Sequence, residues 1–446
     1  MIQWPDGYVS LINYTESLAV PIVTSNRPRV AIIGAGISGL AAAYELSTTH
    51  SVNLFEAASR LGGHARTVMA GLRGDQPVDT GFIVFNHPNY PNLTRMFRAL
   101  DVPTKPSNMS FAASIDNGAI EYGLNDFAAL SAQARNMVRP QFWRMIADIM
   151  KFNKHAVSAA ANTDLSLGDF LDQMQLGDWF RRYYLLPVSG AIWSSTPEQM
   201  QNFPARSLVQ FFENHALLSH NNHQWHTVDG GSIEYIRRIA RAVRNQGGEI
   251  HENTPVEGVR RHANGVSIRA AGSEWKEFDE VIFACHSDDA LALLEQPTDL
   301  EKTILSDLTY QSNRAVLHRD ETLMPTRRKC WSSWVFLSPD NQPKPAIGLT
   351  YWMNSLQNIP NNDPLFLSLN PPKPIREEMI YDETEFRHPV FDRAAIKAQE
   401  ALPGIQGQNH THYCGAYTRW GFHEDGYASA MKVIENLRQP ARKAAA

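Results

Sequence analysis

The glycine turn at Gly34, Gly36 and Gly39 constrains the fold of this chain more than any other feature. An apolar run precedes the turn at residues 30–33, and a helix-forming stretch follows at residues 40–47. Gly34 permits a tight turn, Gly36 lets the backbone approach a pyrophosphate at the helix N-terminus, and Gly39 lets the helix pack closely on the strand. The pattern therefore predicts the first strand and helix of a dinucleotide-binding unit.

The second strand of this unit ends at an acidic residue. Residues 52–55 form an apolar run that leads into Glu56, 17 residues after Gly39. A carboxylate at this position accepts hydrogen bonds from the ribose of an adenosine group. A chance glycine-rich turn is the alternative, because the glycine string alone is weak evidence. The strand before it, the helix after it and the terminal acid all agree, which favours a nucleotide site.

A second glycine pair follows this acid at once. From Glu56 the chain reads E-x-x-x-R-x-G-G-x-x-x-T, with Arg60, Gly62, Gly63 and Thr67 at the named positions. This string resembles the FAD-dependent amine oxidase superfamily, which includes monoamine oxidases, protoporphyrinogen oxidase and phytoene desaturases. The resemblance implies that the arginine and the glycine pair lie along the pyrophosphate and ribityl chain of FAD. The alternative, a plain surface turn, is disfavoured by its position directly after the nucleotide unit.

The remaining segments alternate between two kinds of structure. Residues 127–219 have a helical pattern, with an N-cap signal at Ser166. Nucleotide-domain elements then return, with a helix expected at 233–244 and strands at 249–259, 266–269 and 278–285. Further strands are expected at 78–85 and 310–318, and a last helix at 427–437.

The resemblance accounts for this alternation, because the FAD domain of the superfamily is interrupted twice. It implies an α/β fold: a Rossmann-type, GR2-like and discontinuous FAD-binding domain with an inserted α+β substrate domain. We expect an N-terminal extension at 1–28, the FAD-binding domain at 29–100, 225–295 and 405–440, and the substrate-binding domain at 101–224 and 296–404.

Non-covalent FAD is the cofactor that the resemblance implies. Some amine oxidases tether FAD through a cysteine upstream of the last motif, whereas Cys414 lies inside the segment Tyr413-Cys414-Gly415. We therefore interpret Cys414 as a small buried residue beside the flavin. Carried over residue by residue, the family motifs place FAD against Gly34, Gly36, Ile37, Ser38, Gly39, Glu56, Ala57, Arg60, Gly62, Gly63, His64, Thr80, Gly81, Phe82, Val256, Ala284, Gly415, Glu424, Asp425 and Gly426.

Three residues near the last motif are candidates for catalysis, namely His423, Tyr417 and Trp420. They surround a predicted helix start, whose dipole favours negative charge on the flavin. Helix capping is the alternative role for the polar string from His423 to Asp425. Other candidates for the pocket wall are aromatic, and such side chains more often fill a core: Phe82, Phe85, Trp331 and Trp334.

The reaction class rests on a departure from the amine oxidases. Those enzymes carry a lysine on a substrate-domain strand, where it holds a water beside the reactive flavin nitrogen, and the matching residues 310–318 contain no lysine. Strings at 79–86, 317–320, 351–354 and 421–426 resemble a bacterial group of amine-oxidase-like proteins. That resemblance implies dehydrogenation of a lipophilic substrate, such as a fatty-acyl chain. A flavin amine oxidase, a redox-neutral flavin-dependent isomerase and a non-catalytic FAD-binding scaffold remain alternatives.

The electron acceptor is constrained by a missing motif. Enzymes that reduce their flavin with NAD(P)H commonly carry a second glycine-rich βαβ unit, and none follows residue 39. We therefore expect electrons to leave to oxygen, a quinone or a carrier protein.

Composition limits the class of protein. The 446 residues exceed one compact core and predict two domains. A net charge of -5 gives no general attraction to nucleic acid. The three widely spaced cysteines indicate neither a zinc site nor a disulfide framework, which fits a reducing cytoplasm. Residues 1–28 lack the features of a signal peptide, and no run of 18 apolar residues predicts a membrane-spanning helix.

Two further patterns admit a functional and a structural interpretation. His215, His220, His223 and His226 lie close together, but their spacing fits no familiar set of ligands, and we predict no metal site. Residues 135–154 interleave aromatic and apolar side chains with arginine and lysine. Such a helix either packs on its own domain or lies on a membrane surface as a peripheral contact.

Overall fold

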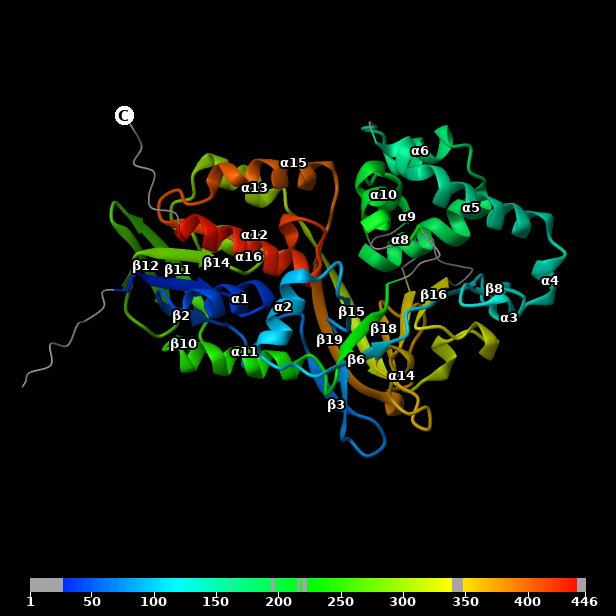
Figure 1. The fold of residues 1–446 in the computed structure, drawn as a ribbon, viewed down its shortest axis with the longest axis horizontal. Helices are drawn as coiled ribbons and strands as arrows, with labels where there is room; N and C mark the ends of the chain where they lie inside the picture. The colour runs from blue at the N-terminus through cyan, green and yellow to red at the C-terminus, as the bar shows by residue number, and fades with distance from the viewer. Residues whose placement is uncertain are drawn as a thin grey trace, which may run out of the picture.

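The computed structural model describes residues 27–161, 163–193, 197–214, 217–218, 223–338 and 348–438. A five-stranded parallel sheet lies at one end of the molecule (Figure 1). Its order is β10-β2-β1-β14-β20, and its strands are β1 (Arg29–Ile33), β2 (Ser51–Phe55), β10 (Glu249–His251), β14 (Glu280–Phe283) and β20 (Thr411–Tyr413). Because a parallel sheet is covered on both faces, these strands read as continuous apolar runs.

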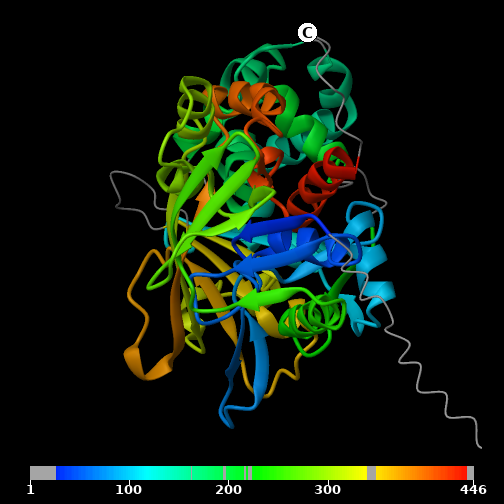
Figure 2. The same cartoon turned by 90° about the vertical axis from the view of Figure 1, so that its left-hand side faces the viewer.

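Alternate residues of β1 point into two different cores. Val30 and Ile32 pack with helices α1 (Ile37–Leu46), α11 (Ile233–Asn245) and α16 (His423–Arg438). Ala31 and Ile33 face the opposite layer. That layer contains β11 (Val256–His262), β12 (Gly265–Ala270), α12 (Ser287–Leu293), α13 (Asp299–Ser306) and α15 (Arg393–Ala401), with β13 (Lys276–Phe278) at its edge. Figure 2 shows the sheet between these layers. The Rossmann arrangement predicted from the glycine turn is confirmed.

A seven-stranded sheet joins two distant parts of the chain. Its order is β19-β15-β18-β17-β16-β7-β8, and β16 pairs with β7 in parallel while the other pairs are antiparallel. Its strands are β7 (Phe111–Ile115), β8 (Ile120–Gly123), β15 (Tyr310–His318), β16 (Trp334–Ser338), β17 (Gly348–Trp352), β18 (Phe366–Leu369) and β19 (Ile380–Pro389). The strand predicted at residues 310–318 is β15, with the same bounds.

Helices cover β7, β8 and β16, as the pattern at residues 127–219 predicts. They are α3 (Phe127–Leu130), α4 (Ala134–Met137), α5 (Pro140–Ala160), α6 (Leu167–Gln173), α7 (Asp178–Phe180), a π-turn (Arg181–Leu185), α8 (Leu186–Trp193), α9 (Pro197–Gln201) and α10 (Ala205–Asn214). Ser166 caps α6, because its hydroxyl accepts the N–H of Asp169 at 3.2 Å. Among the described helices, none is both long and apolar enough to cross a membrane.

Smaller elements connect these layers. They are the hairpin of β3 (Thr67–Ala70) and β4 (Gln76–Asp79), the small sheet of β5 (Val84–Asn86), β6 (Thr104–Ser107) and β9 (Trp225–Val228), the helices α2 (Pro91–Ala99) and α14 (Met353–Leu356), and five 3-10 turns (Glu321–Leu323, Arg328–Cys330, Glu377–Met379, Leu402–Ile405 and Ala416–Thr418).

Several predicted elements have different bounds in the structure, and the strand predicted at 278–285 is the shorter β14. Residues 78–85 are not one strand, because Gly81 lies against the carbonyl of His64 and separates β4 from β5. Residues 249–259 divide between two sheets as β10 and β11, since Pro255 has no N–H to continue a ladder. The last helix begins at His423 rather than at residue 427, so the polar string from His423 to Asp425 forms its first turn.

Candidate cofactor and substrate site

A cavity of about 1850 Å³ runs from the parallel sheet to the helical layer. One end is lined by Phe55, Glu56 and Val256, and the other by Val188 and Phe211. Sites for one small molecule typically measure about 300–1,000 Å³. The cavity therefore has room for a dinucleotide and a second ligand together.

The glycine turn forms the floor of the nucleotide end. Gly34 has a φ of +99°, and Gly36 precedes α1 without any side-chain cap. A Cβ added at Gly36 would contact no protein atom within 4 Å, and one added at Gly63 would lie 3.1 Å from the Gly36 Cα. The first-turn N–H groups of a helix lack intrahelical acceptors, and Ile37 and Ser38 line the cavity here. This glycine-lined hollow at a helix start fits a pyrophosphate.

Glu56 lies beside this turn in a fixed position. Its carboxylate accepts the N–H of Ala35 at 2.8 Å and the N–H of Ala58 at 2.9 Å. It lines the cavity with Ala57 and Ala284. An anchored carboxylate at this point is suited to the hydroxyl groups of a ribose.

Several predicted cofactor residues support the site without lining it. A Cβ at Gly39 would lie 1.8 Å from the carbonyl oxygen of Gly34, and one at Gly62 would lie 2.5 Å from that of Ala65. A Cβ at Gly426 would lie 2.8 Å from the Ser38 hydroxyl, so this glycine lets α16 pack on α1. These three glycines permit close packing behind the cavity wall.

Glu424 and Asp425 use their carboxylates within the protein. Glu424 accepts the N–H groups of Asn92 and Leu93 at the start of α2, at 3.1 and 3.0 Å. Asp425 accepts the N–H of Phe422 at 3.0 Å. Both carboxylates therefore act as helix caps, and neither side chain is directed to the cofactor. A cofactor contact through the backbone of Glu424, Asp425 or Gly426 stays a prediction.

The loops of the second glycine pair and of the last motif meet at the middle of the cavity. Arg60 donates to the carbonyl oxygen of Gly63 at 2.8 Å and so shapes its own loop. The lining here combines residues that are far apart in the sequence: Arg60, Gly63, His64, Thr80, Gly81, Phe82, Gly415, Tyr417, Trp420 and His423.

His423 is held on two sides. Its ring stacks on Phe82, with centroids 3.9 Å apart, and its Nε2 lies 3.0 Å from the Tyr235 hydroxyl. Burial, together with the nearby His64, lowers the pKa of His423 to about 3. The imidazole is therefore neutral at pH 7 and serves as a fixed wall with one hydrogen-bonded nitrogen.

A second group of imidazoles also lines the cavity. His64 packs against both Phe386 and His388, with ring centroids at 4.9 and 5.3 Å, and His286 lies 6.0 Å away. Burial lowers the pKa of His64 to about 4 and that of His388 to about 3. The Nδ1 of His388 accepts the amide of Asn313 at 3.0 Å, which leaves the proton on Nε2. These rings add hydrogen-bonding atoms to the site without adding charge.

Three buried donors on the cavity wall have no hydrogen-bond partner among the described residues. They are the indole N–H groups of Trp334 and Trp420 and the hydroxyl of Tyr417. Burial raises the pKa of Tyr417 well above its ordinary value, so the hydroxyl keeps its proton. Each of these atoms has almost no accessible surface, so the three donors are buried within the cavity wall rather than open to the cavity.

Two of the aromatic candidates lie elsewhere. Phe85 is buried in the core with its ring 5.1 Å from that of Phe97 on α2, and Trp331 donates its N–H to the carbonyl of Pro325 at 2.9 Å. Neither lines the cavity. The sequence pattern also did not indicate Phe386 and His388, which reach the cavity from β19. Their spacing of two residues on a strand predicts that both side chains share one face of the sheet. It does not predict whether that face is the one that lines the cavity.

Cys414 is buried and does not line the cavity, whereas Cys285 does. Burial raises the pKa of both thiols, that of Cys414 to about 12. The described cysteines are free, so no disulfide involves them.

Metal ligation has one geometric candidate in the described part of the chain. His286, Asp288 and Asp289 bring ligand atoms within 4.8 Å of one another. Arg387 pairs with both carboxylates, which balances their charge. From the histidine tract, His223 and His226 are described, and His215 and His220 lie outside the described residues.

The far end of the cavity, which we call the substrate arm, is apolar. It lies between the seven-stranded sheet and the helical layer, and no lysine lines the described cavity. The carboxylates on the cavity wall are Glu56 at the nucleotide end, Asp289 beside Arg387, and the exposed Glu385. The arm residues are Phe111, Leu124, Tyr184, Val188, Ile192, Trp193, Phe211, Phe212, Leu217, Trp334, Tyr351, Leu367 and Phe391.

Known proteins resemble this chain in sequence and in structure. A Mycobacterium tuberculosis protein described as a flavin-containing monoamine oxidase, AofH, is 26% identical over 264 residues, which cover 54% of this chain and 53% of that protein. The chain thus spans about half the length of this curated relative. A putrescine oxidase structure superimposes with a TM-score of 0.68 at 14% identity and covers 92% of this chain and 98% of its own.

A fatty acid isomerase from P. acnes that produces CLA has a TM-score of 0.66 at 15% identity, with 92% and 99% coverage. At these identities the two solved structures establish the fold alone. The model of the family described as flavin containing amine oxidoreductase matches residues 37–317, more than half of the chain. The chain therefore belongs to the flavin-containing amine oxidoreductase family, which implies FAD as its cofactor.

Proposed function

We propose that this protein dehydrogenates a lipophilic substrate, such as a fatty-acyl chain, with non-covalent FAD. The observation that carries the proposal is the apolar substrate arm, whose wall combines Val188, Ile192 and Phe211 with aromatic side chains of the facing sheet. Burying apolar surface contributes about 25 cal/mol per Å², so an extended hydrocarbon would gain affinity along this wall.

Bound FAD would supply a hydride acceptor, and the protein would supply orientation and a dry environment. Neutral side chains would provide both this orientation and this dry environment. Phe82 and His423 stack as one rigid wall, and the side chains of Trp334 and Trp420 line the cavity beside it. Such fixed walls orient a substrate without a charged partner.

Recognition of a protonated amine favours an anionic or electron-rich partner. The three cavity carboxylates lie at the nucleotide end, beside Arg387 or at an exposed position. Together with the missing lysine, this distribution supports a neutral, apolar reacting group. For the reoxidation step we propose oxygen, a quinone or a carrier protein, because the chain has one glycine-rich dinucleotide turn.

Amine oxidation is the second candidate, and the similar proteins favour it. Both AofH and the putrescine oxidase carry amine oxidase names. Aromatic residues such as Trp334 and Tyr351 on the arm could also face a cation. A redox-neutral isomerase is a further candidate, since the fold also serves a fatty acid isomerase.

Anaerobic titration of the FAD-loaded protein separates these reactions. Long-chain acyl substrates should bleach the flavin absorbance, while primary amines should leave it unchanged. Bleaching by amines alone would replace the proposal with amine oxidation, and acyl products formed without net bleaching would indicate an isomerase. A lack of any reaction with both sets would favour a non-catalytic FAD-binding scaffold.

A matched pair of variants tests the substrate arm. Val188→Trp adds bulk on the arm, whereas Leu300→Trp adds it at an exposed position on α13 away from the cavity. Bleaching by long-chain substrates should slow at least about tenfold in the first variant only, because added bulk excludes the chain. Equal rates in both variants would contradict binding along Val188.

A further inference from the structure

An apolar surface covers the helices at one end of the molecule. Nine large hydrophobic side chains are exposed in the described part of the chain, and six of them fall within residues 124–157. Phe127 is 68% exposed, Val138 81% and Met150 66%. Isolated exposed apolar residues are normal on a protein, whereas a group on neighbouring elements marks a binding surface.

On α5 these side chains lie along one line. Trp143, Met150 and Val157 recur every seven residues and therefore share a helix face, apart from the buried face of Phe142 and Phe152. The Trp143 indole donates to the carbonyl oxygen of Met137 at 2.9 Å and so joins α5 to α4. We call the exposed side chains of Phe127, Val138, Trp143, Met150 and Val157 the α3–α5 surface.

The same segment is cationic in an anionic protein. Residues 124–160 contain five arginines and lysines against two aspartates, so their net charge is +3, whereas the chain carries -5. Arg144, Lys151 and Lys154 lie on α5 itself and are exposed. Apolar side chains bordered by cations are the features of a surface that binds anionic lipid.

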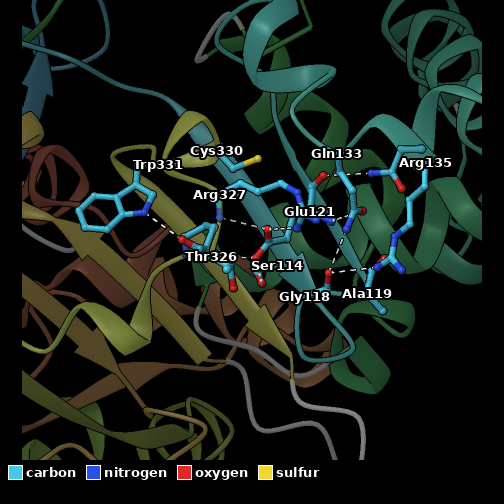
Figure 3. A network of polar contacts seen from close by, with 12 residues as sticks. Ser114, Gly118, Ala119, Glu121, Gln133, Arg135, Thr326, Arg327, Cys330 and Trp331 are labelled. Atoms are coloured by element: carbon cyan, nitrogen blue, oxygen red, sulfur yellow. Dashed lines mark hydrogen bonds and ion pairs between the residues drawn. The ribbon is translucent and has the colours of Figure 1, made fainter.

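A buried polar network holds this surface in place (Figure 3). Glu121 on β8 is fully buried and forms an ion pair with Arg327 at 2.7 Å. The side chain of Gln133 accepts the N–H of Glu121 at 3.0 Å and donates to the carbonyl of Gly118, and Arg135 donates to the carbonyl of Ala119. The helix α4 is thereby fixed to the sheet, which preorganises the exposed Val138 at its C-terminal end.

Part of the cavity wall comes from the chain segment just before these side chains. Leu124 lines the substrate arm, the neighbouring Asn125 also lines the cavity, and Leu124 is 38% exposed. They stand three and two residues, respectively, before Phe127. The segment that begins the α3–α5 surface therefore also contributes to the cavity wall.

We propose that the α3–α5 surface docks on the face of an anionic phospholipid bilayer. Phe127, Val138, Trp143 and Met150 enter the interfacial region, while the cations of α5 face the headgroups. Entry of a lipid substrate past Leu124 is a consequence that rests on the proposed function. The docking itself does not depend on which reaction the flavin performs.

Sedimentation of the FAD-loaded full chain with vesicles tests the docking. One set contains phosphatidylcholine alone, and in the other about a quarter of the lipid is phosphatidylglycerol. The protein should pellet with the anionic vesicles, and added salt should weaken the binding. Failure to pellet with anionic vesicles at low salt would overturn the proposal.

A matched pair of double variants locates the contact. Val138→Asp with Met150→Asp changes the proposed surface, and Met69→Asp with Leu72→Asp changes equally apolar positions on the β3–β4 hairpin, 57% and 66% exposed. The first pair should lower vesicle affinity at least about tenfold, while the second should retain it. Equal losses in both would show that the α3–α5 surface has no special role.

Two controls distinguish membrane docking from damage to the flavin site and from self-association. None of the four substituted residues lines the cavity, so flavin content and bleaching by detergent-dispersed substrate should stay at wild-type levels. If wild type binds vesicles but no substrate bleaches the flavin, docking stands and the proposed function fails. If the first pair changes the size of the particle in solution while vesicle binding is unchanged, the surface contacts a second copy and the proposal is wrong.

Discussion

Asp79 at the end of β4 accepts two hydrogen bonds from Ser232, which lies 153 residues further along the chain. The backbone N–H and the hydroxyl of Ser232 both reach its Oδ1 at 2.8 Å. Thr67 donates to the same oxygen at 2.6 Å, and Gln357 donates to Oδ2 at 3.0 Å. A buried carboxylate at the start of α11 thus joins three separate parts of the chain and complements the positive end of the helix dipole.

This buried carboxylate should make stability depend on pH. Burial raises the pKa of Asp79 from 3.8 to about 6, against the opposing hydrogen bonds from Thr67 and Ser232. Between these values the folded chain holds a proton that the unfolded chain releases. Protonated Asp79 therefore contributes about 3 kcal/mol to the free energy of unfolding below about pH 4. This contribution is lost as the pH rises through 6.

Urea unfolding of wild type and Asp79→Asn at about pH 4 and pH 7 measures this contribution. The asparagine is neutral at both pH values. Its amide N–H group would replace the acceptor oxygen that the amide N–H of Gln357 uses, so two donors would face each other. The variant should therefore be less stable than wild type at the lower pH. The difference should shrink by about 3 kcal/mol at the higher pH. A difference independent of pH would refute a raised pKa at Asp79.

The two glycines of the first turn should respond differently to substitution. A Cβ at Gly36 meets no protein atom within 4 Å, whereas a Cβ at Gly39 would lie 1.8 Å from the Gly34 carbonyl oxygen. Gly36→Val should leave the melting temperature of the apoprotein unchanged but weaken FAD binding at least about tenfold, because the side chain fills the pyrophosphate hollow. Gly39→Ala should lower the melting temperature itself. Calorimetry and flavin titration of both variants measure the two effects, and undiminished FAD affinity in Gly36→Val would exclude this placement of the pyrophosphate.

Glu424 should contribute to stability as a cap of α2. Its carboxylate satisfies the N–H groups of Asn92 and Leu93, and it is 8% exposed. Glu424→Ala should therefore cost about 1–3 kcal/mol in the free energy of unfolding, because buried donors lose their acceptor. Glu435→Ala on the exposed side of the same helix is the control and should change stability by less than about 0.5 kcal/mol. Denaturant titration distinguishes them, and equal costs would contradict a specific cap.

FAD should leave the protein on denaturation. Cys414 lies off the cavity wall, and burial keeps both it and the cavity-lining Cys285 as thiols rather than reactive thiolates. Acid precipitation of the holoprotein should give a colourless pellet and free FAD in the supernatant. Flavin that stays with the pellet would reveal a covalent link.

Local pattern was sufficient for the nucleotide end of the site. The elements β1, α1 and β2 are consecutive, and their glycines follow from contacts within about 30 residues, such as that of Gly39 with Gly34. Glu56 was predicted for the same reason, because a strand end fixes where its next residue lies. The domain boundaries inferred from the same resemblance stay a prediction.

Tertiary structure decided the rest of the cavity. Phe386 and His388 reach His64 only because β19 pairs with β15 along its length, and a shift of one residue would turn both side chains away. The apolar arm depends likewise on α8 and α10 lying over a sheet whose strands come from two distant segments. The sequence alone determined the fold of the nucleotide unit and the FAD cofactor, because short-range geometry encodes both. Strand register and helix packing between segments far apart determined the wall that faces the substrate, since no local pattern records which distant faces meet.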